Sequence, residues 1–555
     1  MAGLGLTACV AVDEQTNALD DSASASGDYC PFIVRKGIMS LDFNPGFLHV
    51  DSYRDASSST GEARREGLTI SSFFNAFVVP GGNPPVGFFE RDLVARIPDI
   101  GRVDLYGFDP ATDVEELTDL APGQPKMVWP NEAVRAPDGV FPFEAVVIPQ
   151  GFLPTPFPGR LTAIDLDDPM RTEYVIHQST QDFGSGYTFP GDPNNSPRFY
   201  HRVLFIDMDG DGLEDIVTVR SGMRVAPSAY PPFSELVYFK NPGAAIDPET
   251  PWDEVVLYGG PAAEFLGPDI HVEAFDFEGD GIPELVTTHF FTGFPAAPGE
   301  PPPQHGKITL YGAPVGGTWA DVDASAFALP RIKDLSSDQG YPFDIQVVDL
   351  NRDGRVDILA TNHQPDNCSP MTASEVPGRV YALEQPESGA IFEDDWTTRI
   401  LLDDIRPNPS LAPVQAPGRL APGRAQTFYP VRYAEDFAKP WIIVGGDEAS
   451  KVWILEPRDI LDSDDWEYNA AVVFDINDFY GPGTTQTPMS DPFGITISTI
   501  GGVAVRYDEP GPYAAAEIYI PVFEGKEIHV LSYRPNFFDE LIRCPEVTPL
   551  ECPAQ

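Results

Sequence analysis

The stretch Asp207-Met-Asp-Gly-Asp-Gly-Leu-Glu-Asp215 decides the fold of this chain, because two similar stretches follow it at nearly constant spacing. They are Asp276-Phe-Glu-Gly-Asp-Gly-Ile-Pro-Glu284 and Asp349-Leu-Asn-Arg-Asp-Gly-Arg-Val-Asp357, which begin 69 and then 73 residues later. Short apolar runs flank the copies, as Val203-Leu-Phe-Ile206 and Ile216-Val-Thr-Val219 flank the first. An acidic turn between two apolar runs, repeated at this period, predicts a protein built from repeated sheets.

Each copy carries oxygen-bearing side chains at positions 1, 3, 5 and 9 and a glycine at position 6. Such oxygens are the ligands that calcium prefers, the glycine permits the sharp turn, and position 7 can add a backbone carbonyl. We therefore expect about three structural calcium ions. The predicted ligands are Asp207, Asp209, Asp211, Leu213 and Asp215 in the first loop, Asp276, Glu278, Asp280, Ile282 and Glu284 in the second, and Asp349, Asn351, Asp353, Arg355 and Asp357 in the third.

The loops differ from EF-hands, which need a bidentate glutamate at position 12 and a helix on each side. Position 12 is Thr218, Thr287 and Ala360 in the three copies, and the flanks are β-rich. A strand, an acidic calcium loop and a second strand resemble the FG-GAP/VCBS repeats of the integrin-α-like β-propeller family. The resemblance implies that each loop joins the first and second strands of a blade at one face of a ring.

A second signature, a short apolar run that has the pattern of a strand entered from a turn, predicts the number of blades. Its copies mostly begin 71–76 residues apart, with one shorter step of 58. Each unit has room for about four short strands, which is typical of a propeller blade. The sequence therefore predicts an all-β, seven-bladed β-propeller with calcium-binding loops in blades three to five. The seven copies lie at 101–106, 159–164, 235–239, 306–311, 378–383, 450–455 and 526–531.

The propeller takes up residues 31–535 in this interpretation, between a signal remnant or tether at 1–30 and a Cys/Pro-rich tail at 536–555. The seventh unit reaches only its third strand before the tail begins. A ring with a missing strand leaves an exposed sheet edge. We therefore expect the segment 32–50 to supply the fourth strand of blade seven.

The net charge of the chain is −50, from 35 basic and 85 acidic residues. Such acidity excludes a nucleic-acid-binding surface and simple electrostatic attachment to anionic lipid. No segment is long and apolar enough to span a membrane. The composition suits an extracellular or cell-surface protein.

The N-terminal Leu6-Thr-Ala-Cys9 resembles the lipobox of a bacterial lipoprotein, although the preceding apolar stretch is short and has no basic residue. Either Cys9 is lipidated and anchors the chain, or the resemblance is chance. The other four cysteines permit two disulfides outside the cytosol, with a connectivity that the sequence leaves open.

Several basic side chains fall at equivalent places when residues are counted from the acidic loops. The resemblance puts them on the face opposite the loops, where long inserts also lie. Arginine and histidine there could bind the carboxylate or sulfate of an acidic sugar while a tyrosine stacks on its ring. They could instead neutralise a uronate while a histidine or tyrosine takes its α-proton, and Tyr200, Tyr230 and Tyr341 are close by in sequence. These candidate binding or catalytic residues are His201, Arg202, Arg220, His271, His289 and His363.

Two functions remain open at this point, and with them the question of whether the chain is an enzyme. The first is a binding module that presents this face to a glycan or an extracellular protein. The second is a lyase or dehydratase that carries out β-elimination on an acidic sugar. In an enzyme, at least two of the four histidines should converge with an arginine in one pocket. Otherwise each histidine is a hydrogen-bonded structural residue, and Arg220 pairs with an acidic neighbour.

Overall fold

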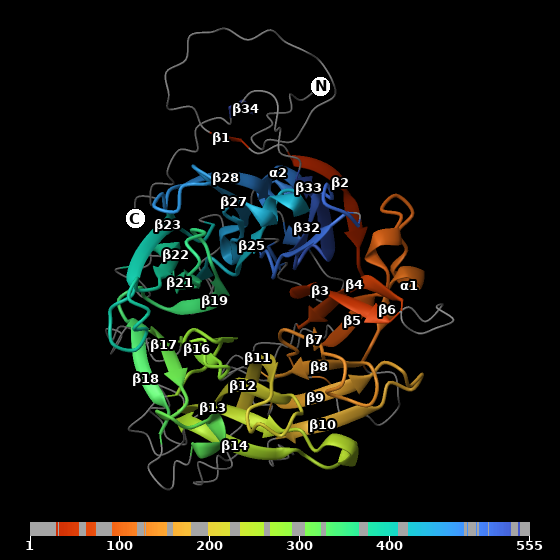
Figure 1. The fold of residues 1–555 in the computed structure, drawn as a ribbon. Helices are drawn as coiled ribbons and strands as arrows, with labels where there is room; N and C mark the ends of the chain where they lie inside the picture. Colours follow the sequence, from red (N-terminus) through yellow and green to blue (C-terminus); the bar gives the residue numbers. More distant parts are fainter. Residues whose placement is uncertain are drawn as a thin grey trace, which may run out of the picture.

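Seven four-stranded, antiparallel sheets of the described chain form the blades of one ring (Figure 1). The first strand of each blade lies nearest the middle of the ring and the fourth lies at its rim. A seven-bladed β-propeller is therefore confirmed. The computed structural model describes residues 29–30, 33–54, 63–73, 92–118, 127, 129–151, 159–178, 198–222, 233–259, 267–290, 306–322, 329–365, 376–408, 420–481, 485–486, 495–496, 499–508, 510–533 and 542–543.

Blades one to three follow one another along the chain, each built from consecutive strands. Blade one comprises β3 (Phe47–Arg54), β4 (Arg64–Ser72), β5 (Leu93–Ile97) and β6 (Glu115–Glu116); blade two comprises β7 (Val134–Arg135), β8 (Ala145–Pro149), β9 (Arg160–Asp165) and β10 (Glu173–Gln178); blade three comprises β11 (Arg198–Ile206), β12 (Asp215–Gly222), β13 (Phe233–Lys240) and β14 (Asp253–Gly259).

Blades four to six continue the same order. Blade four comprises β15 (Val272–Phe275), β16 (Glu284–His289), β17 (Lys307–Gly312) and β18 (Arg331–Ser336); blade five comprises β19 (Pro342–Val348), β20 (Asp357–Asn362), β22 (Gly378–Glu384) and β23 (Thr397–Ile405); blade six comprises β25 (Ala425–Phe428), β26 (Trp441–Gly445), β27 (Lys451–Pro457) and β28 (Tyr468–Asp475).

Blade seven closes the ring with strands from both ends of the chain. β31 (Ala504–Tyr507), β32 (Ala516–Val522) and β33 (Glu527–Tyr533) come from the C-terminal side, and β2 (Ile33–Ser40) pairs antiparallel with β33 as the fourth strand. β2 lies inside the segment that the sequence analysis assigned to this place, whereas the end of that segment begins β3 of blade one. A two-stranded ribbon of β1 (Tyr29–Cys30) and β34 (Ile542–Arg543) also joins the two ends.

The remaining elements of the described chain are short. They are α1 (Pro110–Asp113), α2 (Ile476–Tyr480), the ribbons β21 (Gln364–Pro365) with β24 (Leu420–Ala421) and β29 (Thr485–Gln486) with β30 (Ile495–Thr496), and 3-10 turns at Ile100–Arg102, Gly243–Ala245, Trp319–Asp321, Arg432–Asp436 and Asp447–Ala449. None of the helices in the described residues has the length and apolar character needed to cross a bilayer.

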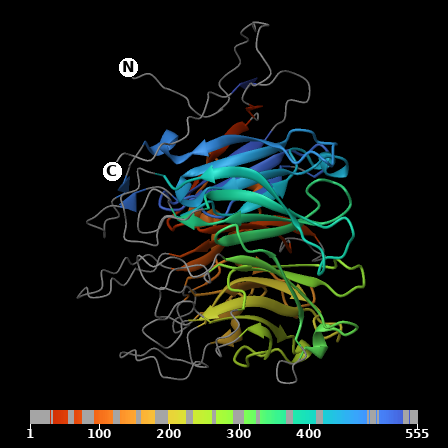
Figure 2. The same cartoon turned by 90° about the vertical axis from the view of Figure 1, so that its left-hand side faces the viewer.

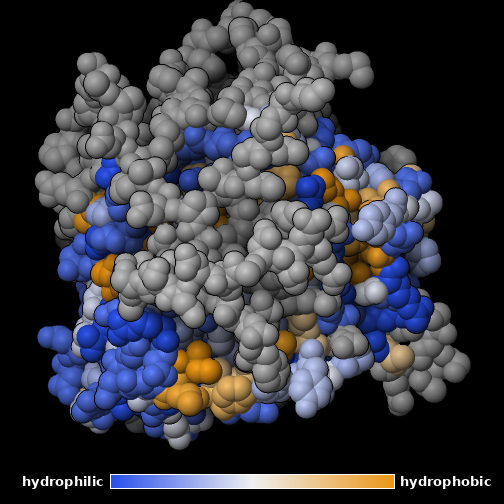
Figure 3. Space-filling view, turned by 90° about the horizontal axis from the view of Figure 1, so that it is seen from above, coloured by the Kyte–Doolittle hydropathy of each residue, from blue (hydrophilic) through white to orange (hydrophobic). Residues whose placement is uncertain are grey.

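The core lies between neighbouring blades rather than in one central mass. All residues of β8, β16, β20, β26 and β32 are buried, because the second strand of a blade is covered on both faces. One apolar cluster, for example, packs Val217 and Leu236 of blade three against Leu285 and Tyr311 of blade four. Figure 2 shows the stacked blades edge-on, and hydrophilic side chains cover much of the described surface in Figure 3.

Six of the seven copies of the apolar signature form the third strand of a blade, namely β9, β13, β17, β22, β27 and β33. The first copy, at 101–106, was wrongly predicted to be a strand. Its start lies in a 3-10 turn, Asp104 accepts the N–H of Tyr106 in a further turn, and the Tyr106 side chain is exposed. β5, whose Leu-Val-Ala-Arg-Ile sequence is almost wholly buried, is the third strand instead.

Candidate functional site

The three acidic loops occupy the same place in blades three, four and five, where each joins the first strand to the second. The residue at position 9 has the same role in all three. Asp215, Glu284 and Asp357 accept the backbone N–H of the residue at position 2 of their own loop, over 3.0–3.1 Å. Burial raises the pKa of both Glu284 and Asp357 to about 7. The carboxylate at position 9 therefore pins each loop to its blade.

The first loop is the one whose acidic side chains converge. Asp207 accepts the N–H groups of Gly210, Asp211 and Gly212 over 2.8–3.1 Å, and both glycines have the positive φ that this turn requires. Side-chain oxygens of Asp207, Asp209 and Asp215 lie within 4.8 Å of one another. This donor set fits a calcium ion, with Lys240 the only cationic side chain placed against it among the described residues, 3.1 Å from Asp209.

The second and third loops fit calcium less well, because an arginine occupies an acidic ligand in each. Arg331 binds both carboxylate oxygens of Glu278, over 2.9 and 2.6 Å. Arg355, at position 7 of the third loop, forms an ion pair with Asp353 at position 5 of the same loop. A cation at either loop must first displace a guanidinium, so the three predicted sites are unequal.

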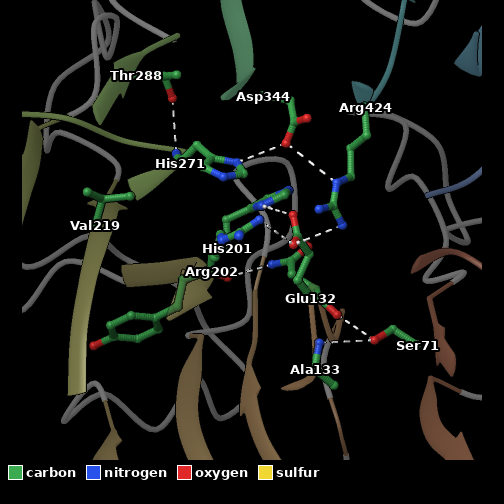
Figure 4. Close-up of polar contacts among 12 residues, drawn as sticks. Ser71, Glu132, Ala133, His201, Arg202, Val219, His271, Thr288, Asp344 and Arg424 are labelled. Carbon is green, nitrogen blue, oxygen red and sulfur yellow. Dashed lines mark hydrogen bonds and ion pairs between the residues drawn. The ribbon is translucent and has the colours of Figure 1, made fainter. Parts of the chain in front are cut away.

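A second group of charged side chains gathers where the first strands of five blades begin (Figure 4). We call it the axial cluster, and we call the face at which the first strands begin the entry face; the acidic loops lie at the opposite ends of those strands. The members of the cluster are Glu132 before β7, His201 and Arg202 in β11, His271 and Glu273 at the start of β15, Asp344 in β19 and Arg424 before β25.

Glu132 is the hub of one half of the cluster, and its side chain is almost fully buried. One carboxylate oxygen lies 3.2 Å from Nη1 of Arg202 and 3.2 Å from Nη1 of Arg424. The other lies 3.7 Å from Nδ1 of His201. Burial opposes ionisation of Glu132, but Arg424 and Arg202 outweigh that effect and hold its pKa below the usual range. Glu132 is therefore an anion held by two guanidinium groups.

Asp344 and Glu273 form the other half around His271. Nδ1 of His271 lies 3.2 Å from Oδ1 of Asp344, and Nε2 lies 3.5 Å from Glu273. Arg424 reaches Asp344 at 3.5 Å, and Arg202 reaches Glu273 at 2.6 Å. Burial raises the pKa of Asp344 to about 7 and also raises that of Glu273. The Asp344 carboxyl thus gains and loses its proton near neutrality.

The histidines of the cluster carry no charge at pH 7. Burial lowers the pKa of His201 to about 4 and, with Arg202 nearby, holds that of His271 well below its usual range. Backbone irregularities lie beside three members of the cluster: the ladder shifts register between Tyr200 and Val203, around His201 and Arg202, and again between Pro342 and Asp344. Bulges of this kind redirect side chains at functional sites.

Aromatic rings adjoin the axial cluster at the entry face. We call this chain of contacts the aromatic belt: Phe73, Phe47, His201, Phe343 and His363 follow one another with ring centroids 4.7–5.8 Å apart. Trp129 stacks on Phe73 at 4.8 Å. The rings of Phe47, Phe73, Trp129 and Phe343 are only half-buried, and His201 connects the belt to Glu132.

The predicted site residues fall into two groups in the structure. His201, Arg202 and His271 converge in the axial cluster, and His363 joins it through the belt, with Nδ1 donating to the Pro422 carbonyl at 2.8 Å. His289 instead faces the Tyr311 hydroxyl inside blade four, 3.1 Å away.

Arg220 belongs to the second group, because it is fully buried and bonded to Glu235 and Glu254 at 2.7 Å. Arg220 thus pairs with acidic neighbours, as one of the two interpretations of the sequence allows, and its role as a ligand-binding arginine stays a prediction. The proposed lipidation site Cys9 lies outside the described residues, as do most of the long inserts and the cysteines beyond Cys30.

Sequence reasoning missed Glu132, Glu273, Arg424 and the role of Asp344. A signal was present, since a charged residue stands at or near the start of the first strand in each of blades two to six.

No protein-family model matches this sequence, and the search of curated proteins found no match either. The resemblance to FG-GAP/VCBS repeats consequently rests on the three acidic loops and remains a prediction.

Proposed function

We propose that this protein is a calcium-stabilised binding propeller that takes a carbohydrate at its entry face. The observation that carries the proposal is the juxtaposition of an aromatic belt, whose phenylalanine rings are partly exposed, with a polar cluster built from five blades. Aromatic rings present flat apolar faces on which sugar rings stack, while polar groups beside them fix orientation. A rigid ring that holds both kinds of group at one point is suited to recognition.

Calcium has a stabilising role in this proposal, at a distance from the binding site. The first acidic loop would hold its ion through Asp207, Asp209, Asp211 and Asp215, and the other two loops would bind more weakly. An ion there links the first and second strands of a blade and offsets the repulsion among clustered carboxylates. The acidic composition and the lipobox-like N-terminus support an extracellular or cell-surface location, which remains part of the proposal.

A lyase or dehydratase is the second candidate function, and the His271–Asp344 pair is the observation that favours it. Two of the predicted histidines converge with arginines, and Asp344 can exchange a proton near neutral pH. Against an acidic-sugar substrate, both arginines of the cluster already bind carboxylates of the protein. An enzyme of this kind would therefore abstract a proton without a free cation, among the described residues, to hold a uronate.

A glycan array probed with the calcium-loaded protein tests the binding function, with Trp129→Ala and Phe343→Ala as site variants. Tyr106→Ala is the matched control, because Tyr106 is an exposed aromatic residue outside the belt. We expect at least a tenfold loss of affinity in the two site variants and none in the control. Equal binding by all three variants would remove the entry face from consideration. Absorbance at the unsaturated-uronate band, followed on the same samples, reports lyase activity.

A further inference from the structure

The axial cluster has one carboxylate more than its arginines can neutralise. Glu132, Glu273 and Asp344 face Arg202 and Arg424, and both histidines of the cluster are neutral at pH 7. The excess belongs to Asp344. Its Oδ2 accepts the Ala425 N–H at 3.1 Å, whereas its buried Oδ1 has no well-directed hydrogen bond from any described residue.

Among the residues that the structure describes, an anionic ligand finds no spare cation at this site. Arg202 and Arg424 each contact two carboxylates of the protein, and Arg220, which the sequence also suggested, does the same deeper in blade three. The chain as a whole has a net charge of −50, so the long-range field also repels anions and attracts cations.

The aromatic belt adds a second preference in the same direction. The face of an aromatic ring is the negative end of its quadrupole, and it attracts a cation placed over it. Phe343 precedes Asp344 in the chain, and the half-buried rings of Phe47 and Phe343 both lie within 6 Å of the His201 ring that contacts Glu132. The belt therefore adjoins the cluster that holds the excess carboxylate.

We propose that the entry face recognises an amine-bearing ligand, whose single positive charge passes over the aromatic belt and binds Asp344 at the axial cluster. This inference rests on the proposed function, because it takes the ligand to be a carbohydrate. It then names the class of that carbohydrate, which is an amino sugar with free amino groups. In the empty protein a proton on Asp344 balances the cluster, and the ligand's ammonium group takes the place of that proton. One positive charge leaves the cluster neutral.

A divalent metal is the competing occupant, because donor atoms of Glu132, His271 and Asp344 lie within 4.8 Å of one another. Such an ion would need Glu132 as a ligand, and the Glu132 oxygen that is nearest both guanidinium groups already lies 3.2 Å from each of them. Its double charge would also leave the cluster with a net positive charge. A monovalent ammonium group needs neither change.

The test compares four probes by titration calorimetry at pH 7. They are an oligomer of glucosamine, its fully N-acetylated counterpart, a galacturonate oligomer of the same length, and spermidine as an amine without a sugar. We expect the glucosamine oligomer to bind at least tenfold more tightly than the acetylated and galacturonate oligomers, and added salt to weaken its binding.

Asp344→Asn should abolish this preference for the amine, and Glu273→Gln is the second variant should the first fail to fold. Asp395→Asn, at a fully exposed carboxylate beside Lys333, is the matched control and should bind as the wild type does. Equal binding of the acetylated or galacturonate oligomer would overturn the amine preference and leave the proposed carbohydrate function intact. Asp344-dependent binding of spermidine alone would support the amine site and contradict a carbohydrate ligand. Binding of no probe would overturn both.

Discussion

The acidic loops and the axial cluster lie at opposite ends of the same innermost strands, and they satisfy their carboxylates in different ways. Asp207 in the first loop takes N–H groups from within five residues along the chain. Glu132 takes its partners from blades three and six, 69 to 292 residues away. The loop is a local structure within a single blade, whereas the cluster exists only when blades two to six are assembled.

This difference predicts a difference in energetic cost. A carboxylate in an exposed loop retains water around it, so its ion pairs contribute little. A carboxylate at the axis has exchanged water for guanidinium groups, and the loss of one partner leaves a buried charge without compensation. The axial cluster is consequently the place where single substitutions should be most damaging.

The largest effect should follow the replacement of Arg202. Arg202→Met leaves Glu132 and Glu273 without their shared partner, and we expect a loss of about 3–5 kcal/mol in the free energy of unfolding. Lys240→Met, at the exposed partner of Asp209 in the first loop, should cost less than about 1 kcal/mol. Chemical denaturation of both variants measures the two costs, and similar values would break the distinction between the two regions.

The same difference explains how much of the molecule the sequence could predict. The loops and six of the seven third strands could be predicted because each consists of consecutive residues. Their glycines indicate turns, and their alternating apolar positions indicate strands. The copy at 101–106 led to a wrong prediction. Its sequence has the strand pattern, but the third strand of blade one is β5, which precedes it in the chain, and the copy itself begins in a 3-10 turn. The axial cluster depends on the angles between five blades, and Glu132 and Arg424 carry no local pattern that distinguishes them from other charged residues.

Calcium removal should have the next largest effect. At a free calcium concentration about a hundredfold above the dissociation constant, each occupied loop adds about 2.7 kcal/mol to stability. We expect chelation to lower the Tm, and Asp211→Ala to remove most of the calcium-dependent part, because the first loop has the best donor set. Asp464→Ala, at an exposed aspartate outside the loops, is the control. A Tm indifferent to chelation, in protein that elemental analysis finds free of calcium, would contradict calcium binding at the loops.

The proton on Asp344 gives a pH-dependent prediction for the axial cluster. Because the pKa values of Glu284 and Asp357 in the loops are raised as well, a variant of Asp344 is needed to isolate its share. Because burial raises the pKa of Asp344 to about 7, the folded protein holds a proton that the unfolded chain has lost between about pH 4 and pH 7. Its contribution to stability is therefore full below that window and decreases as the pH rises, by at most about 1.4 kcal/mol per pH unit.

Asp344→Asn keeps an oxygen for the Ala425 N–H and removes the titration. We expect the variant to gain stability relative to the wild type as the pH rises from 4 to 7, and the difference to level off above 7. His201 and His363, whose pKa values are lowered to about 4, act in the opposite direction in both proteins and cancel in the comparison. A difference in unfolding free energy that stays constant across this window would show that Asp344 does not titrate there.

The smallest expected effect distinguishes the loops from one another. Arg331→Leu frees both oxygens of Glu278, which the guanidinium now occupies, so the second loop should bind calcium about tenfold more tightly, or about 1.4 kcal/mol. A calcium titration of the Arg331→Leu variant that also carries Asp211→Ala isolates the effect, because the first loop then lacks a ligand and should not bind calcium. Arg406→Leu, at an arginine paired with Asp404 outside the loops, is the control. An unchanged or lower affinity in the Arg331 variant would mean that the arginine supports the loop instead of competing with the ion.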